Sequence, residues 1–427
     1  MMSIRRPQQQ TVASLPATRE IDAPSFRRRV VILCSLVAFL DGFDTQSLGP
    51  AASAITAQIG IQLSAFGLVF SVSQVGFLIG ALTFSALGDR FGRKRMLIIA
   101  TAIFAGCTLG TAAVGTYGAL LGWRLLTGLG LGAATPNFIS LASEFSPPSQ
   151  RPRVVTIMWA AVPFGGMVGS FASAAIIPRF GWQAIFFIGS AAPLILIPVL
   201  MSVMPESLEV KIEREGGAER AKAARPSPVA ELFTDGRLRA TLLLWGASFM
   251  TWMTLVVVAF WTPALLQKAG MSARAAASVL ALNNAGGVIG TVLIGMILGW
   301  IRPHSVLITA FLVSAALIAS MGMSIGYFPG LAGAAVFAGF FSSAAGGGLI
   351  AVAAGAYPAD ARATGVGWAL GLGRFGSILG PLGAGLLVAH GWQVPRIYLA
   401  MACPALLAAG LVMLLARDPA SRSVRTT

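Results

Sequence analysis

The sequence predicts an all-α polytopic membrane protein with twelve transmembrane helices, arranged as two parallel, pseudo-symmetric six-helix bundles. Three observations predict it: an apolar composition, twelve long apolar runs and an internal repeat. Of the 427 residues, 56% are hydrophobic and only 11% are charged, whereas an average soluble domain carries about 25% charged residues. A soluble fold of this length would lack the polar residues needed to cover its surface. Disorder is excluded as well, because it requires low hydrophobicity.

The apolar runs define the spans. A helix needs about 20 mostly apolar residues to cross the hydrocarbon core. Runs of this kind lie at residues 30–56, 63–87, 95–114, 117–143, 153–177, 183–204, 239–266, 273–299, 303–324, 328–355, 362–388 and 393–415. The interruption between the sixth and seventh is polar, mixed in charge and proline-containing, which is typical of a solvated linker. We therefore expect a tail (1–29), a first bundle (30–204), a linker (205–238), a second bundle (239–415) and a second tail (416–427).

The basic residues predict the orientation of the chain. Of its 30 Lys and Arg residues, 24 fall in the segments that share a side with the linker and both termini, and four fall on the other side. Cytoplasmic segments carry such an excess, so both termini should be cytoplasmic. No basic helix or aromatic-interleaved patch indicates nucleic-acid binding. The three cysteines lie in separate apolar runs and form neither a disulfide framework nor a metal site, and we expect no cofactor apart from a coupling proton.

An internal repeat supports two equivalent bundles. Gly181-Trp182-Gln183 opens the sixth span and Gly391-Trp392-Gln393 opens the twelfth, 210 residues later. Phe164, Gly165 and Gly169 match Phe375, Gly376 and Gly380 at an offset of 211. Parallel halves of this kind occur in transporters that bind substrate between them near the membrane midplane.

The loop after the second span carries a family motif. Residues 85–95 read S-A-L-G-D-R-F-G-R-K-R and resemble the G-x-L-x-D-R-x-G-R-K/R signature of the major facilitator superfamily. Ser85 replaces the usual first glycine, and Gly299 stands where an acid is common in the second-half copy. The resemblance implies ion pairs at the cytoplasmic helix ends that hold one conformation and break in the other. The predicted gating residues are Asp89, Arg90, Arg93, Lys94, Glu144 and Arg362.

Three further stretches narrow the resemblance. They are L-D-G-F-D-T-Q at 40–46, the segment from Arg124 to Asn137 with Glu144, and Y-P at 357–358 followed by R-A-T-G-V-G-W at 362–368, G-R at 373–374 and G-P at 380–381. Together they are similar to the aromatic acid:proton symporter family over nearly all of residues 30–415. The resemblance implies import of a benzoate-, hydroxybenzoate- or phenylpropionate-like carboxylate across a bacterial inner membrane.

Two acids lie in mid-span. Of the fifteen Asp and Glu residues, only Asp41 and Asp44 do so, and charges there are costly and functional by default. Their i, i+3 spacing places both on one helix face, so we expect both to point into one cavity, where two close carboxylates resist simultaneous ionisation. They are the candidate proton carriers, and the sequence does not separate them. The alternative is an acid paired permanently with Arg124.

Two arginines also lie within spans. The guanidinium fork of Arg374 suits bidentate binding of a carboxylate, so Arg374 is the predicted anion partner of the substrate. Its alternative role is bonding to backbone carbonyls in its glycine-rich span. Arg124 is a second substrate-binding candidate, or a structural partner of Asp41, Asp44 or Glu144.

Weaker candidates could contact the ring of a substrate or its substituents. They are Gln46, Asn137, Asn283, Asn284, Trp252, Trp261 and Trp368. Helix–helix hydrogen bonding is the commoner role of such polar residues, and anchoring at the membrane interface is the commoner role of such tryptophans.

The predicted function is import of an aromatic carboxylate by proton symport through alternating access, in a monomer whose partners are that small molecule and membrane lipid. The alternatives are a proton-coupled drug or metabolite efflux antiporter and a symporter for a non-aromatic organic acid. Efflux transporters often carry G-P-x-x-G-G in the fifth span. Residues 162–166 read V-P-F-G-G, which lacks the first glycine and is one residue short, so the motif does not support efflux. An enzyme is disfavoured, because an intramembrane aspartyl protease needs acids on two different helices. ATP-driven transport lacks its phosphate-binding loop.

Overall fold

The computed structural model describes residues 24–147, 149–206, 229–234, 236–297, 303–358 and 361–418. Twelve helices within these residues are long and apolar enough to cross a membrane, which confirms the predicted fold class. The first bundle contains α2 (Pro24–Ile59), α3 (Phe66–Phe91), α4 (Arg93–Ala112), α5 (Tyr117–Glu144), α6 (Arg151–Phe180) and α7 (Gln183–Val203). The second contains α9 (Leu238–Lys268), α10 (Ala273–Ile297), α11 (Pro303–Met323), α12 (Phe328–Ala356), α13 (Arg362–Ala389) and α14 (Val394–Arg417). Two 3₁₀ turns, η1 (Leu63–Ala65) and η3 (Val229–Phe233), precede α3 and α9.

The first helix begins earlier than the apolar run predicts. It starts at Pro24 and includes three arginines outside the expected span of 30–56. Phe26 in this extension packs edge-on against Phe145, with ring centroids 5.9 Å apart, and that contact gives the polar first turns an apolar anchor. Residues 1–23, most of the predicted linker (207–228) and the chain from 419 onward lie outside the described residues.

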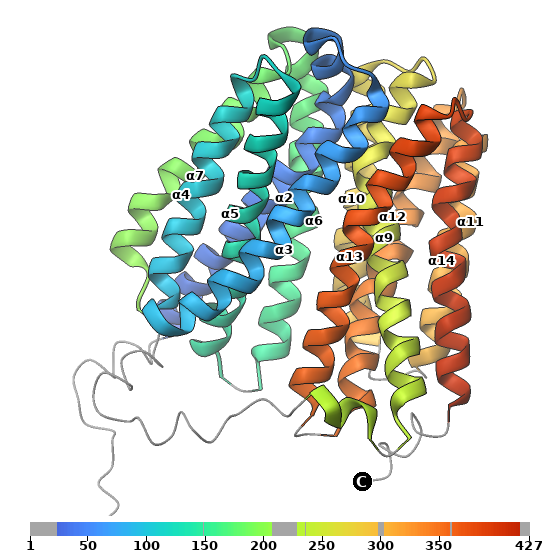
Figure 1. The fold of residues 1–427 in the computed structure, drawn as a ribbon. Coiled ribbons are helices and arrows are strands. Elements are labelled where there is room, and N and C mark those ends of the chain that lie inside the picture. The colour runs from blue at the N-terminus through green and yellow to red at the C-terminus, as the bar shows by residue number, and fades with distance from the viewer. Residues whose placement is uncertain are drawn as a thin grey trace, which may run out of the picture.

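The helices alternate in direction, so the two ends of the molecule can be told apart. We call the linker end the one where α7 ends, α9 begins and α14 ends, at the bottom of Figure 1. The opposite end holds the turns after α2, α4, α6, α9, α11 and α13. At this opposite end the two bundles converge, and toward the linker end they separate (Figure 1).

The repeat read from the sequence has a structural counterpart. Gly165 on α6 and Gly376 on α13 occupy equivalent places in the two bundles. A Cβ on Gly165 would overlap the carbonyl of Phe39 on α2, and a Cβ on Gly376 would overlap that of Phe249 on α9. The fifth helix of each bundle therefore packs closely on the first, which only glycine allows.

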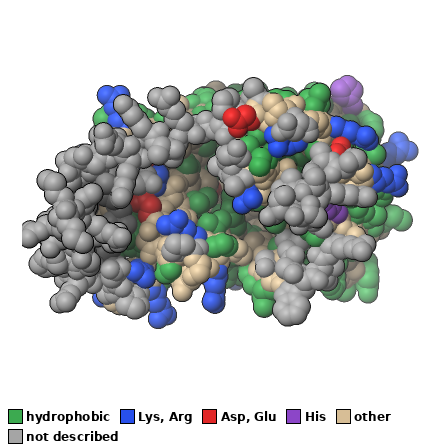
Figure 2. Space-filling view, turned by 90° about the horizontal axis from the view of Figure 1, so that it is seen from below, with side chains coloured by type: hydrophobic (Ala, Val, Ile, Leu, Met, Phe, Trp, Pro, Cys, Tyr) green, Lys and Arg blue, Asp and Glu red, His purple; other side chains and the backbone are tan. Residues whose placement is uncertain are grey.

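The buried core shows which end is closed. One buried cluster, which includes Phe66 and Phe70 from the first bundle and Trp261 and Leu265 from the second, joins both bundles at the opposite end. Toward the linker end each bundle has a separate core. Seen from the linker end, the surface is hollowed between the bundles, with hydrophobic side chains in the hollow (Figure 2). The structure is thus sealed at the opposite end and open at the linker end.

Candidate functional site

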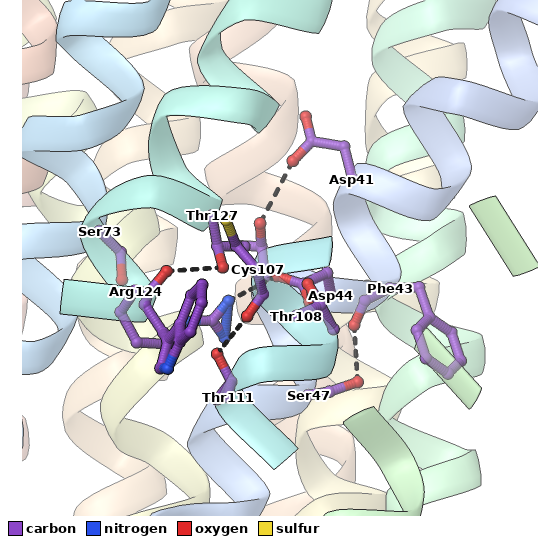
Figure 3. Close-up of polar contacts among 12 residues, drawn as sticks. Asp41, Phe43, Asp44, Ser47, Ser73, Cys107, Thr108, Thr111, Arg124 and Thr127 are labelled. Carbon is purple, nitrogen blue, oxygen red and sulfur yellow. Dashed lines mark hydrogen bonds and ion pairs between the residues drawn. The ribbon is translucent and has the colours of Figure 1, made fainter. Parts of the chain in front are cut away.

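Of the two mid-span acids, Asp44 is the one held by partners on other helices. Its Oδ2 lies 2.8 Å from Nη2 of Arg124 on α5, and its Oδ1 accepts a 2.6 Å hydrogen bond from the Thr108 hydroxyl on α4 (Figure 3). The side chains of Asp44 and Arg124 are 1% and 2% exposed. Both carboxylate oxygens are therefore used inside the first bundle. This is the fixed pairing that the sequence left open as the alternative for one acid.

Asp41 lies one helical turn nearer the linker end and has a different environment. It is buried, and its single hydrogen bond within the described residues comes from the Thr45 hydroxyl of the same helix, at 3.2 Å (Figure 3). It also interacts electrostatically with Arg374 of the second bundle. The expectation that the two acids share one environment is therefore not met, because one turn of α2 directs Asp44 to an internal arginine and leaves Asp41 with a weak local partner.

Arg374 lies on α13, between the bundles, and aromatic rings from both bundles lie against its guanidinium group. Its Cζ is 4.2 Å from the ring centroid of Phe77 on α3 and 4.3 Å from that of Trp252 on α9. A cation–ring contact does not use the N–H groups for conventional hydrogen bonds. Among the described residues no hydrogen bond or ion pair reaches these N–H groups, so the alternative role as a partner of backbone carbonyls does not hold in this structure.

A further ring extends this arrangement across the interface. Trp159 on α6 lies with its ring centroid 6.0 Å from that of Trp252. We call Phe77, Trp159, Trp252 and Arg374 the arginine cluster, in which two members come from each bundle. Phe77 and Trp159 were not predicted, since nothing in the sequence distinguishes them from the other 24 phenylalanines and eight tryptophans.

The polar candidates divide into two groups. Asn137 donates to Ala133 O of its own helix at 2.8 Å and to Phe84 O of α3 at 3.5 Å, and Asn283 donates to Ala335 O of α12 at 3.0 Å, so both amides serve helix packing. Gln46 and Asn284, in contrast, each keep a buried polar atom without a partner among the described residues. Trp368 stacks on Trp245 with ring centroids 5.7 Å apart, away from the arginine cluster. Trp261 donates to Pro381 O at 3.0 Å within the second bundle.

The predicted gating residues lie at the linker end, all in the first bundle except Arg362. Arg93 pairs with Asp89, at 3.1 Å, and with Glu144, and so ties the turn between α3 and α4 to the end of α5. This turn needs a glycine, since Gly92 has φ +104°. Lys94 donates to Met201 O of α7 at 2.9 Å. Arg90 lies over the ring of Phe91, and Arg362 is exposed at the start of α13.

Comparison with known proteins places the chain in a family. The Major Facilitator Superfamily model matches residues 34–324. The 4-hydroxybenzoate transporter PcaK of Pseudomonas aeruginosa is 35% identical, over 94% of this chain and 97% of its own. The 3-(3-hydroxy-phenyl)propionate transporter of Escherichia coli is 35% identical, over 95% of this chain and 98% of its own. A crystal structure of a D-xylose–proton symporter, 18% identical, matches the fold with a TM-score of 0.73 over 90% of this chain and 96% of that one.

These matches confirm the resemblance drawn from the motifs and the expectation that the chain is not an enzyme. The twelve-helix architecture, the charged turn around Gly92 and the matched relatives all indicate the same family. The chain belongs to the major facilitator superfamily, in the branch that contains these aromatic-acid transporters.

Proposed function

We propose that this protein imports an aromatic carboxylate together with protons across the bacterial inner membrane by alternating access. The observation that carries the proposal is Arg374, which contacts the rings of Phe77 and Trp252 and makes no N–H hydrogen bond among the described residues. A partly desolvated guanidinium without a carboxylate is incompletely satisfied, and a bidentate carboxylate is the group that its geometry fits best. Relatives named for aromatic carboxylates support this choice of substrate.

The rings of the arginine cluster suit the other half of such a substrate. Trp159 and Trp252 present aromatic surface from opposite bundles beside the cation. Aromatic pairs gain about 0.5–1.5 kcal/mol beyond the area they bury. A substrate ring next to its own carboxylate would reach this surface while Arg374 binds the anion. The site then favours an aromatic acid over an aliphatic one of the same charge.

Asp41 is the proposed carrier of the coupling proton. Its hydroxyl partner, Thr45, can donate to the ionised form and accept from the protonated form, whereas Asp44 is held by Arg124. An ionised Asp41 competes with the substrate carboxylate for the positive charge of Arg374. Protonation of Asp41 removes this competitor, so proton binding favours substrate binding. Asp44 with Arg124 maintains the shape of α2 around it.

The membrane potential gives a reason for coupling. A monovalent anion that enters a negative interior is opposed by about 2.3 kcal/mol per 100 mV. One co-transported proton makes the step electroneutral. The excess of Lys and Arg at the linker end supports a cytoplasmic location for that end and for both termini. All the residues assigned here come from one chain, so a monomer suffices.

Uptake into proteoliposomes tests the proposal. Labelled 4-hydroxybenzoate should accumulate when an inward proton gradient is imposed, and a protonophore should abolish the accumulation. Arg374→Gln should remove uptake, while the matched Arg396→Gln, an exposed arginine at the opposite end of the same bundle, should retain it. Uptake that is indifferent to the gradient, or that survives Arg374→Gln, contradicts the proposal.

A further inference from the structure

Two side-chain amides from opposite bundles meet at one glycine. A Cβ placed on Gly166 of α6 would lie 2.6 Å from Cγ of Gln46 on α2 and 3.1 Å from Nδ2 of Asn284 on α10. The glycine therefore lets both side chains pack closely against α6. This contact lies at the bundle interface, because α2 and α6 belong to the first bundle and α10 belongs to the second.

Both amides hold unused hydrogen-bonding capacity. Oε1 of Gln46 and Nδ2 of Asn284 are buried and have no partner among the described residues. Asn284 is only 6% exposed, and a buried polar atom without a partner costs about 1–3 kcal/mol. The adjacent Asn283 shows what a packing role looks like, since it donates to Ala335 O at 3.0 Å. Packing of the helices thus accounts for Asn283 and leaves Asn284 unexplained.

The chemistry of the unused atoms matches one functional group. Gln46 offers an acceptor and Asn284 offers a donor, and a hydroxyl is the small group that donates one hydrogen bond and accepts another. Each carboxamide carries both kinds of atom, so the match is also preserved when both amides rotate together, with the donor and acceptor exchanged. A carboxylate fits less well, because it could only accept.

We infer that Gln46 and Asn284 together recognise a phenolic hydroxyl on the ring of the transported acid. The inference rests on the proposed function, in which Arg374 binds the carboxylate of the same molecule. The two amides come from different bundles and already meet at Gly166 in this structure. A hydroxyl that bonds to both therefore bridges the bundles. When the bound molecule lacks this hydroxyl, two buried groups of the protein stay unpaired. Sites of this kind discriminate strongly against such an analogue.

Two matched substrates and four variants test the inference. Uptake of 4-hydroxybenzoate and of benzoate is measured for the wild type, Gln46→Met, Asn284→Leu, Gly166→Ala and the control Asn283→Leu. The ratio of kcat/KM for 4-hydroxybenzoate over benzoate should fall about tenfold in the Gln46→Met, Asn284→Leu and Gly166→Ala variants. A tenfold change corresponds to about one hydrogen bond. Asn283→Leu should lower thermal stability and leave the ratio unchanged. Gly166→Ala guards against misfolding, since alanine favours the helix and the atom nearest its Cβ belongs to the flexible Gln46 side chain.

The outcomes separate the two proposals. A ratio that falls because 4-hydroxybenzoate uptake drops while benzoate uptake is retained supports the hydroxyl site. Equal loss of both substrates with an unchanged ratio in the folded variants overturns it and leaves the amides a structural pair bridged by water. If the wild type carries neither acid, the proposed function fails first, and the inference fails with it.

Discussion

The two aromatic rings beside Arg374 allow a quantitative prediction for Phe77→Leu. A cation over an aromatic ring gains about 0.5–1 kcal/mol at an exposed site and about 2 kcal/mol when desolvated. Arg374 is half-buried, and Phe77 lies 4.2 Å from its Cζ, so loss of this ring should release about 1–2 kcal/mol of stacking energy. The released side chain can then turn toward Asp41, and it must leave that position before it binds a carboxylate.

The stacking energy sets the upper limit of the loss in affinity. We expect Phe77→Leu to weaken 4-hydroxybenzoate binding by about 5- to 30-fold, the factor that corresponds to 1–2 kcal/mol. Binding is measured by thermal shift and calorimetry on purified protein, and KM by proteoliposome uptake. Phe138→Leu is the matched control, since Phe138 is also buried in the first bundle and no Lys or Arg of the described residues lies over its ring. A folded Phe77→Leu variant with KM within about twofold of wild type would refute the reasoning.

Three further predictions concern the acids and the seal. Asp44→Asn should destabilise the protein by about 3–5 kcal/mol, because it leaves the buried charge of Arg124 unpaired; the midpoint of thermal unfolding in detergent should fall, and adding Arg124→Leu should restore it. Asp41→Asn should fold normally and exchange substrate at equal concentrations, yet lose accumulation driven by a proton gradient; retained accumulation would contradict its role as the proton carrier. At the opposite end, a Cβ on Gly385 would lie 2.9 Å from Cα of Gly67 in the other bundle. Gly385→Val should therefore force the bundles apart there and expose the thiol of a Ser71→Cys variant, at a position that is buried in the parent, to membrane-impermeant reagent. The open-space control Gly383→Val should leave that thiol as protected as in the parent.

The sequence predicts features that depend on local composition. Twelve spans follow from length and hydropathy alone, since each helix must satisfy its own backbone in lipid. Arg374 and Arg124 are visible because charges in a span are rare. The pairing of Arg124 with Asp44 rather than Asp41 is not predictable in the same way. It depends on which face of α2 meets α4 and α5, and the i, i+3 spacing of the acids places both near that face.

Side-chain contacts made between the two bundles are not predictable from the sequence. Phe77 reaches Arg374 only because α3 and α13 meet across the interface. Likewise, Asn283 and Asn284 are adjacent in sequence, yet one turns toward α12 and the other toward α6. Small and apolar residues surround both in α10, so no amphipathic pattern indicates which asparagine faces the interface.

The distribution of contacts between the bundles gives substrate binding a defined role in transport. At the opposite end the bundles are joined by packed rings, by the approach of Gly67 to Gly385, and by a 2.6 Å hydrogen bond from Ser71 to Ile378 O. The ion pairs of Arg93 at the linker end stay within the first bundle. A ligand shifts a conformational equilibrium only by its difference in affinity for the two states. A molecule that binds Arg374 of one bundle and Gln46 of the other has this difference, because it gains both contacts only where the bundles approach at mid-membrane. In this view the substrate itself supplies a contact between the bundles at mid-membrane, and a carboxylate without a ring hydroxyl would bind yet bridge them less.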